Sequence, residues 1–261
     1  MSLSCLSAIK NGRQCNKPKI DTIIMVIDRS GSMFKLKDAT LEGVNSFIND
    51  QKSLTDNCNF SLITFDNIIE KPILMQNIKN VDVITEHMIK ARGSTSLNDA
   101  IYNAIIDMDK VNYNGEKTIV IMTDGYENSS KEITKKNLTS LIKSRENKYK
   151  FIYLGANQDA VTTAESYGIN SNSALTYDAS PEFTKAALHC ASNSAKRQRS
   201  GGESGFTPLE RQQSSEISIT CPQLIRQNAN YSSNSLSPIK NGDLNFLFNT
   251  LNDEGFTHFY R

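Results

Sequence analysis

The chain has 261 residues, of which 38% are hydrophobic, and its 29 Lys and Arg nearly balance its 28 Asp and Glu, for a net charge of +1. This balance argues against a dedicated nucleic-acid-binding protein, which carries a clear basic excess. No run approaches the ~20 apolar residues that a membrane span needs, so we expect no membrane association.

Residues 1–20 are polar and irregular, and we expect a flexible leader there. A continuous apolar run, Thr22–Ile27, follows, and such runs are typical of strands that are buried on both faces. Further strands are predicted at Asn59–Phe65, Ile68–Leu74, Lys117–Thr123, Lys150–Leu154 and Ser173–Tyr177. Helical spacing of apolar residues predicts helices at Leu36–Leu54, Val81–Lys90, Leu97–Lys110, Ile133–Asn147, Ala160–Tyr167 and Pro181–Ser194.

Strands that alternate with helices predict a parallel sheet covered on both faces. The short turn at Asp66-Asn67 makes Ile68–Leu74 the antiparallel hairpin partner of Asn59–Phe65, and Pro72 fits an edge strand. The predicted fold is therefore α/β and doubly wound, with a mainly parallel six-stranded sheet and one antiparallel edge strand. We assign this domain to residues 21–195.

The composition changes after the domain. Residues 196–242 are rich in Ser, Gln and Asn with few apolar side chains, which predicts a disordered polar linker. Residues 243–261 regain apolar and aromatic content, and either a docking helix or packing on the domain would account for them. No internal repeat is present, and we expect a monomer.

The cysteines and the N-terminus bear on the cellular setting. The five Cys are widely spaced without a Cys-x-x-Cys pair, and only three His are present, so a zinc site is not expected. The N-terminus has no apolar centre of signal-peptide length. We therefore expect reduced thiols and a cytoplasmic location.

Five oxygen-bearing side chains follow predicted strands or precede a predicted helix: Asp28, Ser30, Ser32, Thr95 and Asp124. Open α/β sheets bind ligands outside the carboxyl ends of their strands, where the strand order reverses. If the strands before Asp28 and Asp124 are neighbours there, all five side chains converge. An oxygen set without His or Cys suits a hard cation, Mg²⁺ first, with Mn²⁺ and Ca²⁺ as alternatives.

The order Asp28-Arg29-Ser30-Gly31-Ser32, then Thr95, then Thr123-Asp124-Gly125 resembles the von Willebrand factor A domain. The resemblance covers roughly residues 20–195, and it is closest to stand-alone intracellular members of bacteria and phages. It implies an intact metal-ion-dependent adhesion site.

In that family Ser30 and Ser32 would bind the metal directly, and Thr95 directly or through water. Asp28 and Asp124 would act mostly through water. A metal held by neutral hydroxyls accepts a carboxylate from a partner. The resemblance thus implies a non-enzymatic protein-binding module whose partner offers an acidic side chain.

The sequence also allows other functions. Asp28 could serve as the nucleophile of a phosphotransferase or phosphatase, although the second acid expected two residues later is Ser30. The Asp-x-Ser-x-Ser motif could be a simple helix cap. The C-terminal tail could make the chain an adaptor. Arg29 is expected to be solvated, and the basic cluster Lys196–Arg199 is too small for firm nucleic-acid binding.

Overall fold

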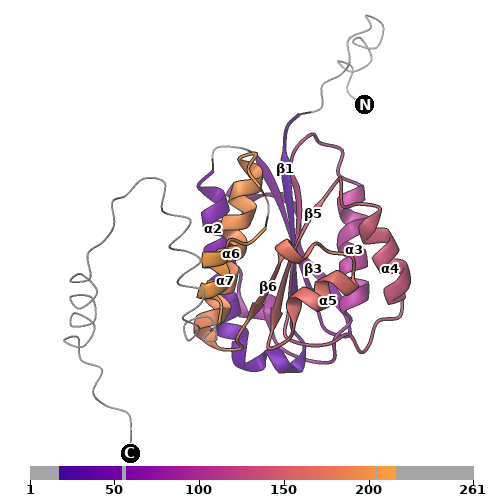
Figure 1. Cartoon of the computed structure of the whole chain (residues 1–261). Helices are drawn as coiled ribbons and strands as arrows, with labels where there is room; N and C mark the ends of the chain where they lie inside the picture. The colour runs from indigo at the N-terminus through magenta and orange to yellow at the C-terminus, as the bar shows by residue number, and fades with distance from the viewer. Residues whose placement is uncertain (1–17, 55–56, 204, 216–261) are drawn as a thin grey trace, which may run out of the picture. The chain divides into compact units, whose positions relative to one another are not determined.

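The computed structural model describes residues 18–54, 57–203 and 205–215 (Figure 1). Most of the expected leader and the apolar segment 243–261 lie outside the described residues. The chain forms a six-stranded sheet in the order β3-β2-β1-β4-β5-β6, and only β3 runs antiparallel to its neighbour. The predicted fold class is confirmed. The strands are β1 (Asp21–Asp28), β2 (Cys58–Phe65), β3 (Ile69–Asn77), β4 (Lys117–Thr123), β5 (Lys150–Ala156) and β6 (Ala174–Tyr177).

Helices cover both faces of the sheet. One face carries α2 (Lys37–Lys52), α6 (Pro181–Arg199) and α7 (Pro208–Gln213), and the other carries α3 (Leu97–Asp109), α4 (Lys135–Lys143) and α5 (Ala160–Ser166) (Figure 1). Short 3-10 turns complete the fold at Gly31–Leu36, Ile78–Asn80, Glu86–Ile89 and Ser171–Ser173. No helix among the described residues is long and apolar enough to cross a membrane.

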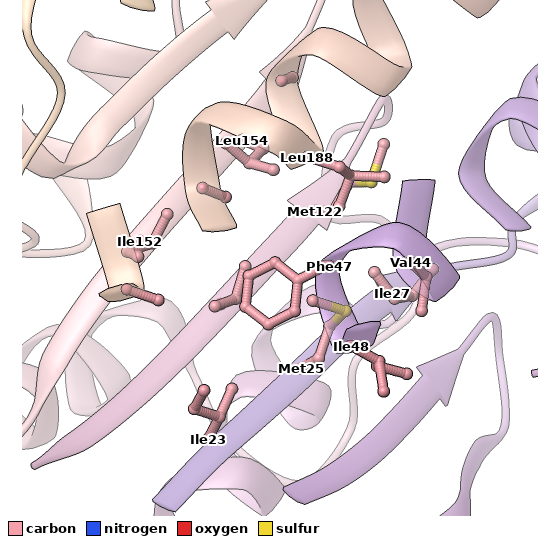
Figure 2. Packing of buried hydrophobic residues seen from close by; sticks show 14 of the residues in the cluster. Ile23, Met25, Ile27, Val44, Phe47, Ile48, Met122, Ile152, Leu154 and Leu188 are labelled. Atoms are coloured by element: carbon pink, nitrogen blue, oxygen red, sulfur yellow. The ribbon is translucent and has the colours of Figure 1, made fainter. Parts of the chain in front are cut away.

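The hydrophobic core has two layers because β1, β4 and β5 are buried on both faces. In the layer under α2 and α6, the Phe47 ring of α2 lies over the middle of the sheet (Figure 2). Leu188 of α6 meets the same layer from the neighbouring helix. All eight residues of β1 are buried, as its continuous apolar run predicts. This central strand positions the loop that follows it.

The predicted helix at Val81–Lys90 is wrong, since only Glu86–Ile89 forms a 3-10 turn. Asn45 of α2 explains the difference, because its amide donates to the Ile84 carbonyl and accepts from the Ile84 N–H, at 3.0 and 2.8 Å. Lys52 also binds the Val81 carbonyl at 2.6 Å. These bonds occupy the backbone groups that a helix would need.

Helix α6 continues to Arg199, beyond the predicted helix end at Ser194, and α7 follows it. Arg199 pairs with Asp21 at 2.9 Å, and both side chains are 1% exposed. Arg197 binds Glu210, which also closes a capping box at the start of α7. The basic cluster is therefore structural. A few buried polar contacts order this segment, and its low apolar content does not reveal them.

Strand order reverses between β1 and β4, which pair in parallel with Ile27 opposite Met122. The loops after these two strands therefore leave the same edge of the sheet at adjacent positions. This is the arrangement on which the predicted convergence of the five side chains depends.

Candidate functional site

The loop after β1 and the loop after β4 meet through a chain of oxygen atoms. The hydroxyls of Ser30 and Ser32 lie 3.0 Å apart. The Ser32 hydroxyl donates to Oδ1 of Asp124 at 2.7 Å. Ser30 is buried whereas Ser32 is exposed, so that the group opens toward solvent on one side.

Asp28 lies beneath this group, at the end of β1, and is 1% exposed. Its Oδ1 accepts a 2.7 Å hydrogen bond from the Ser30 N–H, and its Oδ2 accepts a 2.5 Å bond from the Thr123 hydroxyl. Both carboxylate oxygens are thus oriented by neighbours, and the loop curves around the carboxylate. Asp28 holds Ser30 in place from below.

The Thr95 hydroxyl lies close to Gly125, next to the Ser32 hydroxyl. A Cβ placed on Gly125 would lie 3.2 Å from the Thr95 hydroxyl and 3.8 Å from the Ser32 hydroxyl. Both hydroxyls therefore face the same backbone position beside Asp124. The structure brings together all five side chains that the sequence singles out: Asp28, Ser30, Ser32, Thr95 and Asp124.

Backbone hydrogen bonds fix the three loops to one another. The Arg92 N–H donates to the Arg29 carbonyl at 2.8 Å, and the Gly31 N–H donates to the Gly93 carbonyl at 3.2 Å. Gly93 has a φ of +67°, and a Cβ there would collide with the Asn67 side chain, so this position favours glycine. The loop before α3 is thereby placed against the loop after β1.

Two groups that support the site were missed by sequence reasoning, one at the end of β4 and one in the loop that follows it. Asn128 accepts the Thr95 N–H through its side chain at 2.9 Å, and its own N–H donates to the Thr95 carbonyl. Thr123 orients Asp28, as described above. The Thr-Asp-Gly motif itself contained the signal for Thr123, whereas nothing in the local sequence marks Asn128.

The site has excess negative charge. Burial raises the pKa of Asp28 to about 6, despite opposing hydrogen bonds from Thr123 and Ser30, and burial also raises the pKa of Asp124. Among the ion pairs of the described residues, none involves either carboxylate. One buried acid, Asp28, and one half-buried acid, Asp124, without a basic partner favour a cation between or beside them.

The donor set fits a hard divalent cation. Three hydroxyls and two carboxylates are oxygen ligands of the kind that Mg²⁺ and Mn²⁺ accept. The described residues contain no cluster of three or more His, Cys, Asp and Glu side chains suited to a metal. If only the three neutral hydroxyls bound the cation directly, its immediate ligands would leave most of its charge uncompensated.

The expectation that Arg29 is solvated is wrong, because its side chain is only 2% exposed. Its Nη1 donates to Glu70 at 2.6 Å, and its Nε lies 3.3 Å from Asp66. Arg92 contacts the same two acids at 2.6 and 2.5 Å. The Arg29 hydrogen bond is the main reason that the pKa of Glu70 is lowered to about 2. Arg29 therefore supports the β2–β3 hairpin and is directed away from the oxygen cluster.

Comparison with solved structures identifies similar folds. The pilus adhesin SpaC of Lactobacillus rhamnosus GG gives a TM-score of 0.57 at 14% identity, over 70% of this chain and 31% of that one. The domain of the pilus tip protein Mfa5 from Porphyromonas gingivalis gives 0.53 at 11% identity, over 72% and 98%. Proximal thread matrix protein 1 of the mussel byssus gives 0.52 at 15% identity, over 68% and 46%.

At these identities the likeness shows the fold alone, and the chain spans less than half of the mussel protein and less than a third of SpaC. No curated protein matches the sequence. A profile of the von Willebrand factor type A domain matches residues 22–199, a range that includes the whole oxygen cluster. The chain belongs to the von Willebrand factor type A domain family.

Proposed function

We propose that this protein is a non-enzymatic, divalent-metal-dependent binding module that captures an acidic side chain of a protein partner. The observation that carries the proposal is the convergence of three hydroxyls and two carboxylates, without a basic partner, at the edge where β1 and β4 end. Mg²⁺ is the expected cation, with Mn²⁺ and Ca²⁺ as alternatives.

Ser30 and Ser32 are the proposed direct ligands, and Thr95 is proposed to bind directly or through water, because the three hydroxyls lie together beside Asp124. Asp28 and Asp124 are proposed to balance the charge and to orient these hydroxyls. A cation bound mainly by neutral oxygens supplies a positively charged coordination position for a partner's carboxylate. The exposure of Ser32 gives that carboxylate access from solvent.

Two of the similar structures are consistent with this proposal. Proximal thread matrix protein 1 has also been solved with zinc in its MIDAS motif, the metal-ion-dependent adhesion site (TM-score 0.50, 15% identity, 67% of this chain and 46% of that one). SpaC is an adhesin, and adhesion requires contact with another molecule. We extend metal binding, but not the identity of any partner, from these proteins to this chain.

The phosphatase-like alternative has little to support it. A carboxylate nucleophile must reach a substrate, and Asp28 is 1% exposed with both oxygens already accepting hydrogen bonds. We therefore favour binding without turnover.

Direct titration with Mn²⁺, followed by the paramagnetic signal of the free ion, tests the metal site. We expect one ion to bind to wild type, Ser32→Ala to weaken binding at least about tenfold, and Mg²⁺ to compete. Ser46→Ala, an exposed serine of α2, is the matched control and should bind like wild type. Equal binding by wild type and Ser32→Ala would reject the proposed ligand set.

A further inference from the structure

Three large apolar side chains are exposed in loops at the edge of the sheet that carries the oxygen cluster. Phe34 is 65% exposed, Ile68 51% and Tyr126 71%. They are three of the seven exposed large apolar side chains among the described residues. Single apolar residues are common on protein surfaces, whereas a group of them around one site indicates contact with another molecule. We refer to these three residues as the apolar rim.

Two members of the rim lie directly beside residues of the proposed metal site. Phe34 follows Ser32 by two residues, and Tyr126 follows Asp124 by two residues. The Cα atoms of each pair are therefore at most about 7 Å apart. Because the Ser32 hydroxyl donates to Asp124 at 2.7 Å, the two rings belong to adjoining loops of one site.

Ile68 lies in the turn after β2, beside the third loop of the site. The Asp66 carbonyl of this turn accepts the Ser96 N–H at 2.8 Å, next to Thr95. Each of the three loops that form the oxygen cluster therefore carries or contacts one member of the apolar rim.

Phe34 is held outward by its neighbours. Met33 and Leu36 of the same 3-10 turn are buried in the core layer under α2, at 2% and 3% exposure. The Lys37 Nζ lies 5.7 Å from the centroid of the Phe34 ring and is itself paired with Glu86 at 2.6 Å. A side chain that is already positioned loses little conformational entropy when a partner covers it.

The size of a protein interface decides whether a partner reaches the rim. A stable interface buries about 800 Å² on each partner, which corresponds to a disc of about 16 Å radius. This radius exceeds the distance of at most about 7 Å between each ring-bearing residue and the metal site. A protein whose carboxylate reaches a cation at Ser32 therefore also covers Phe34 and Tyr126. Apolar partner side chains gain most from that contact, because polar ones would lose water without finding hydrogen-bond partners on the ring faces.

We propose that the partner presents its metal-bound acid in an extended segment, with large apolar side chains two positions before and two positions after the acid. In an extended segment these three side chains point to the same side, at intervals of about 6.6 Å. Phe34 and Tyr126 each receive one of the two apolar side chains, and Ile68 enlarges the apolar surface on the side of Thr95. The inference rests on the proposed function, because the cation anchors the acid.

An array of immobilised peptides tests the proposal, with a fixed central Asp and the positions two before and two after it varied among Leu, Phe, Ser and Lys. The full-length protein is applied in Mg²⁺ or in EDTA. We expect Mg²⁺-dependent binding and a preference of about tenfold for Leu or Phe over Ser at each of the two positions, as expected from the burial of roughly 55 Å² of apolar surface.

Three variants assign the preference to the apolar rim. Phe34→Ser and Tyr126→Ser should each lose most of the preference at one of the two positions, because each removes one ring. Tyr113→Ser is the matched control. Tyr113 is 40% exposed and precedes β4, at the opposite end of that strand from Tyr126, so this variant should bind like wild type. Titration with Mn²⁺ shows whether a variant has lost apolar surface alone, since the rim contributes no metal ligand.

The outcomes separate this inference from the proposed function. Asp-dependent binding in Mg²⁺ without an apolar preference would overturn the role of the rim and leave the metal site standing. A preference that Phe34→Ser and Tyr126→Ser both retain would do the same. If the protein binds Mn²⁺ but no peptide in an Asp- and Mg²⁺-dependent way, capture of a carboxylate is wrong, and the role of the rim is overturned with it.

Discussion

Thr123 of β4 donates a 2.5 Å hydrogen bond to the carboxylate of Asp28 at the end of β1. The same hydroxyl oxygen accepts the Gly125 N–H at 3.2 Å. One side chain therefore joins the strand that carries the first acid to the loop that carries the second. The spacing between the two loops depends on this contact.

Replacing Thr123 with Val keeps the shape of the side chain and removes its hydroxyl. We expect this variant to lose about 1–3 kcal/mol of unfolding free energy, because a buried carboxylate loses a donor. Urea denaturation measures the change. Thr123→Ser retains the hydroxyl and should recover most of the loss. A Val variant as stable as wild type, together with an unstable Ser variant, would show that packing, and not the hydrogen bond, matters there.

Divalent cations should stabilise the folded protein. For a Kd on the order of 1 mM, 10 mM Mg²⁺ or Mn²⁺ adds about 1.4 kcal/mol by mass action. That corresponds to a rise of roughly 3–5 °C in Tm relative to EDTA for a domain of this size. Asp124→Asn should abolish the rise, while Asp82→Asn, at an exposed position, should preserve it. A rise that persists in Asp124→Asn would place the ion elsewhere.

Removing Arg29 should be costly although it binds no proposed ligand. Arg29→Met leaves the fully buried Asp66 with a weaker set of partners, and we expect a loss of about 3–5 kcal/mol. Arg92 contacts the same acids but is half-exposed, so Arg92→Met should cost at most about 1 kcal/mol. Guanidinium denaturation measures the loss of unfolding free energy in both variants. Equal losses in Arg29→Met and Arg92→Met would contradict the prediction.

Acid should weaken the hairpin that carries Glu70. Its pKa is about 2 in the folded state against an ordinary value of 4.5, mainly because of Arg29. Ionised Glu70 therefore stabilises the fold above about pH 4.5, and this contribution disappears as the pH falls toward 2.

Comparison with Glu70→Gln isolates this contribution. The difference in unfolding free energy between wild type and Glu70→Gln should be largest above pH 5 and should shrink toward pH 2–3. Glu165→Gln, at an exposed position of α5, provides a control with a small difference throughout. A constant difference between wild type and Glu70→Gln across the range would show that the salt bridge does not shift the titration of Glu70.

The sheet and the polar residues at the carboxyl ends of its strands were predictable because they depend on local patterns. The apolar run of β1, the Pro72 edge strand and the polar residues directly after β1 and β4 are each visible in a few adjacent letters. Strand adjacency then brings Asp28 and Asp124 together without further information. The predicted oxygen cluster therefore follows from topology alone.

The errors share a different cause, which is contact between residues far apart in the sequence. Asn45 determines the conformation at Ile84, and Asp21 orders the end of α6 through Arg199. Arg29 looks like a surface residue in its own segment, and it is buried because the β2–β3 hairpin brings acids to it. Such polar contacts leave no periodic pattern for a reader of the sequence to find.

The first and last described segments lie at opposite ends of the strands. Asp21 begins β1 at the amino ends of the parallel strands, whereas Ser214 binds the Thr176 carbonyl and the Asp178 N–H at the carboxyl end of β6. If the protein were attached to a biosensor surface through a position before residue 18, the oxygen cluster would thus face the solution that carries the partner. Attachment just after residue 215 would place the sensor surface on the same side of the domain as the oxygen cluster and would hinder access of the partner.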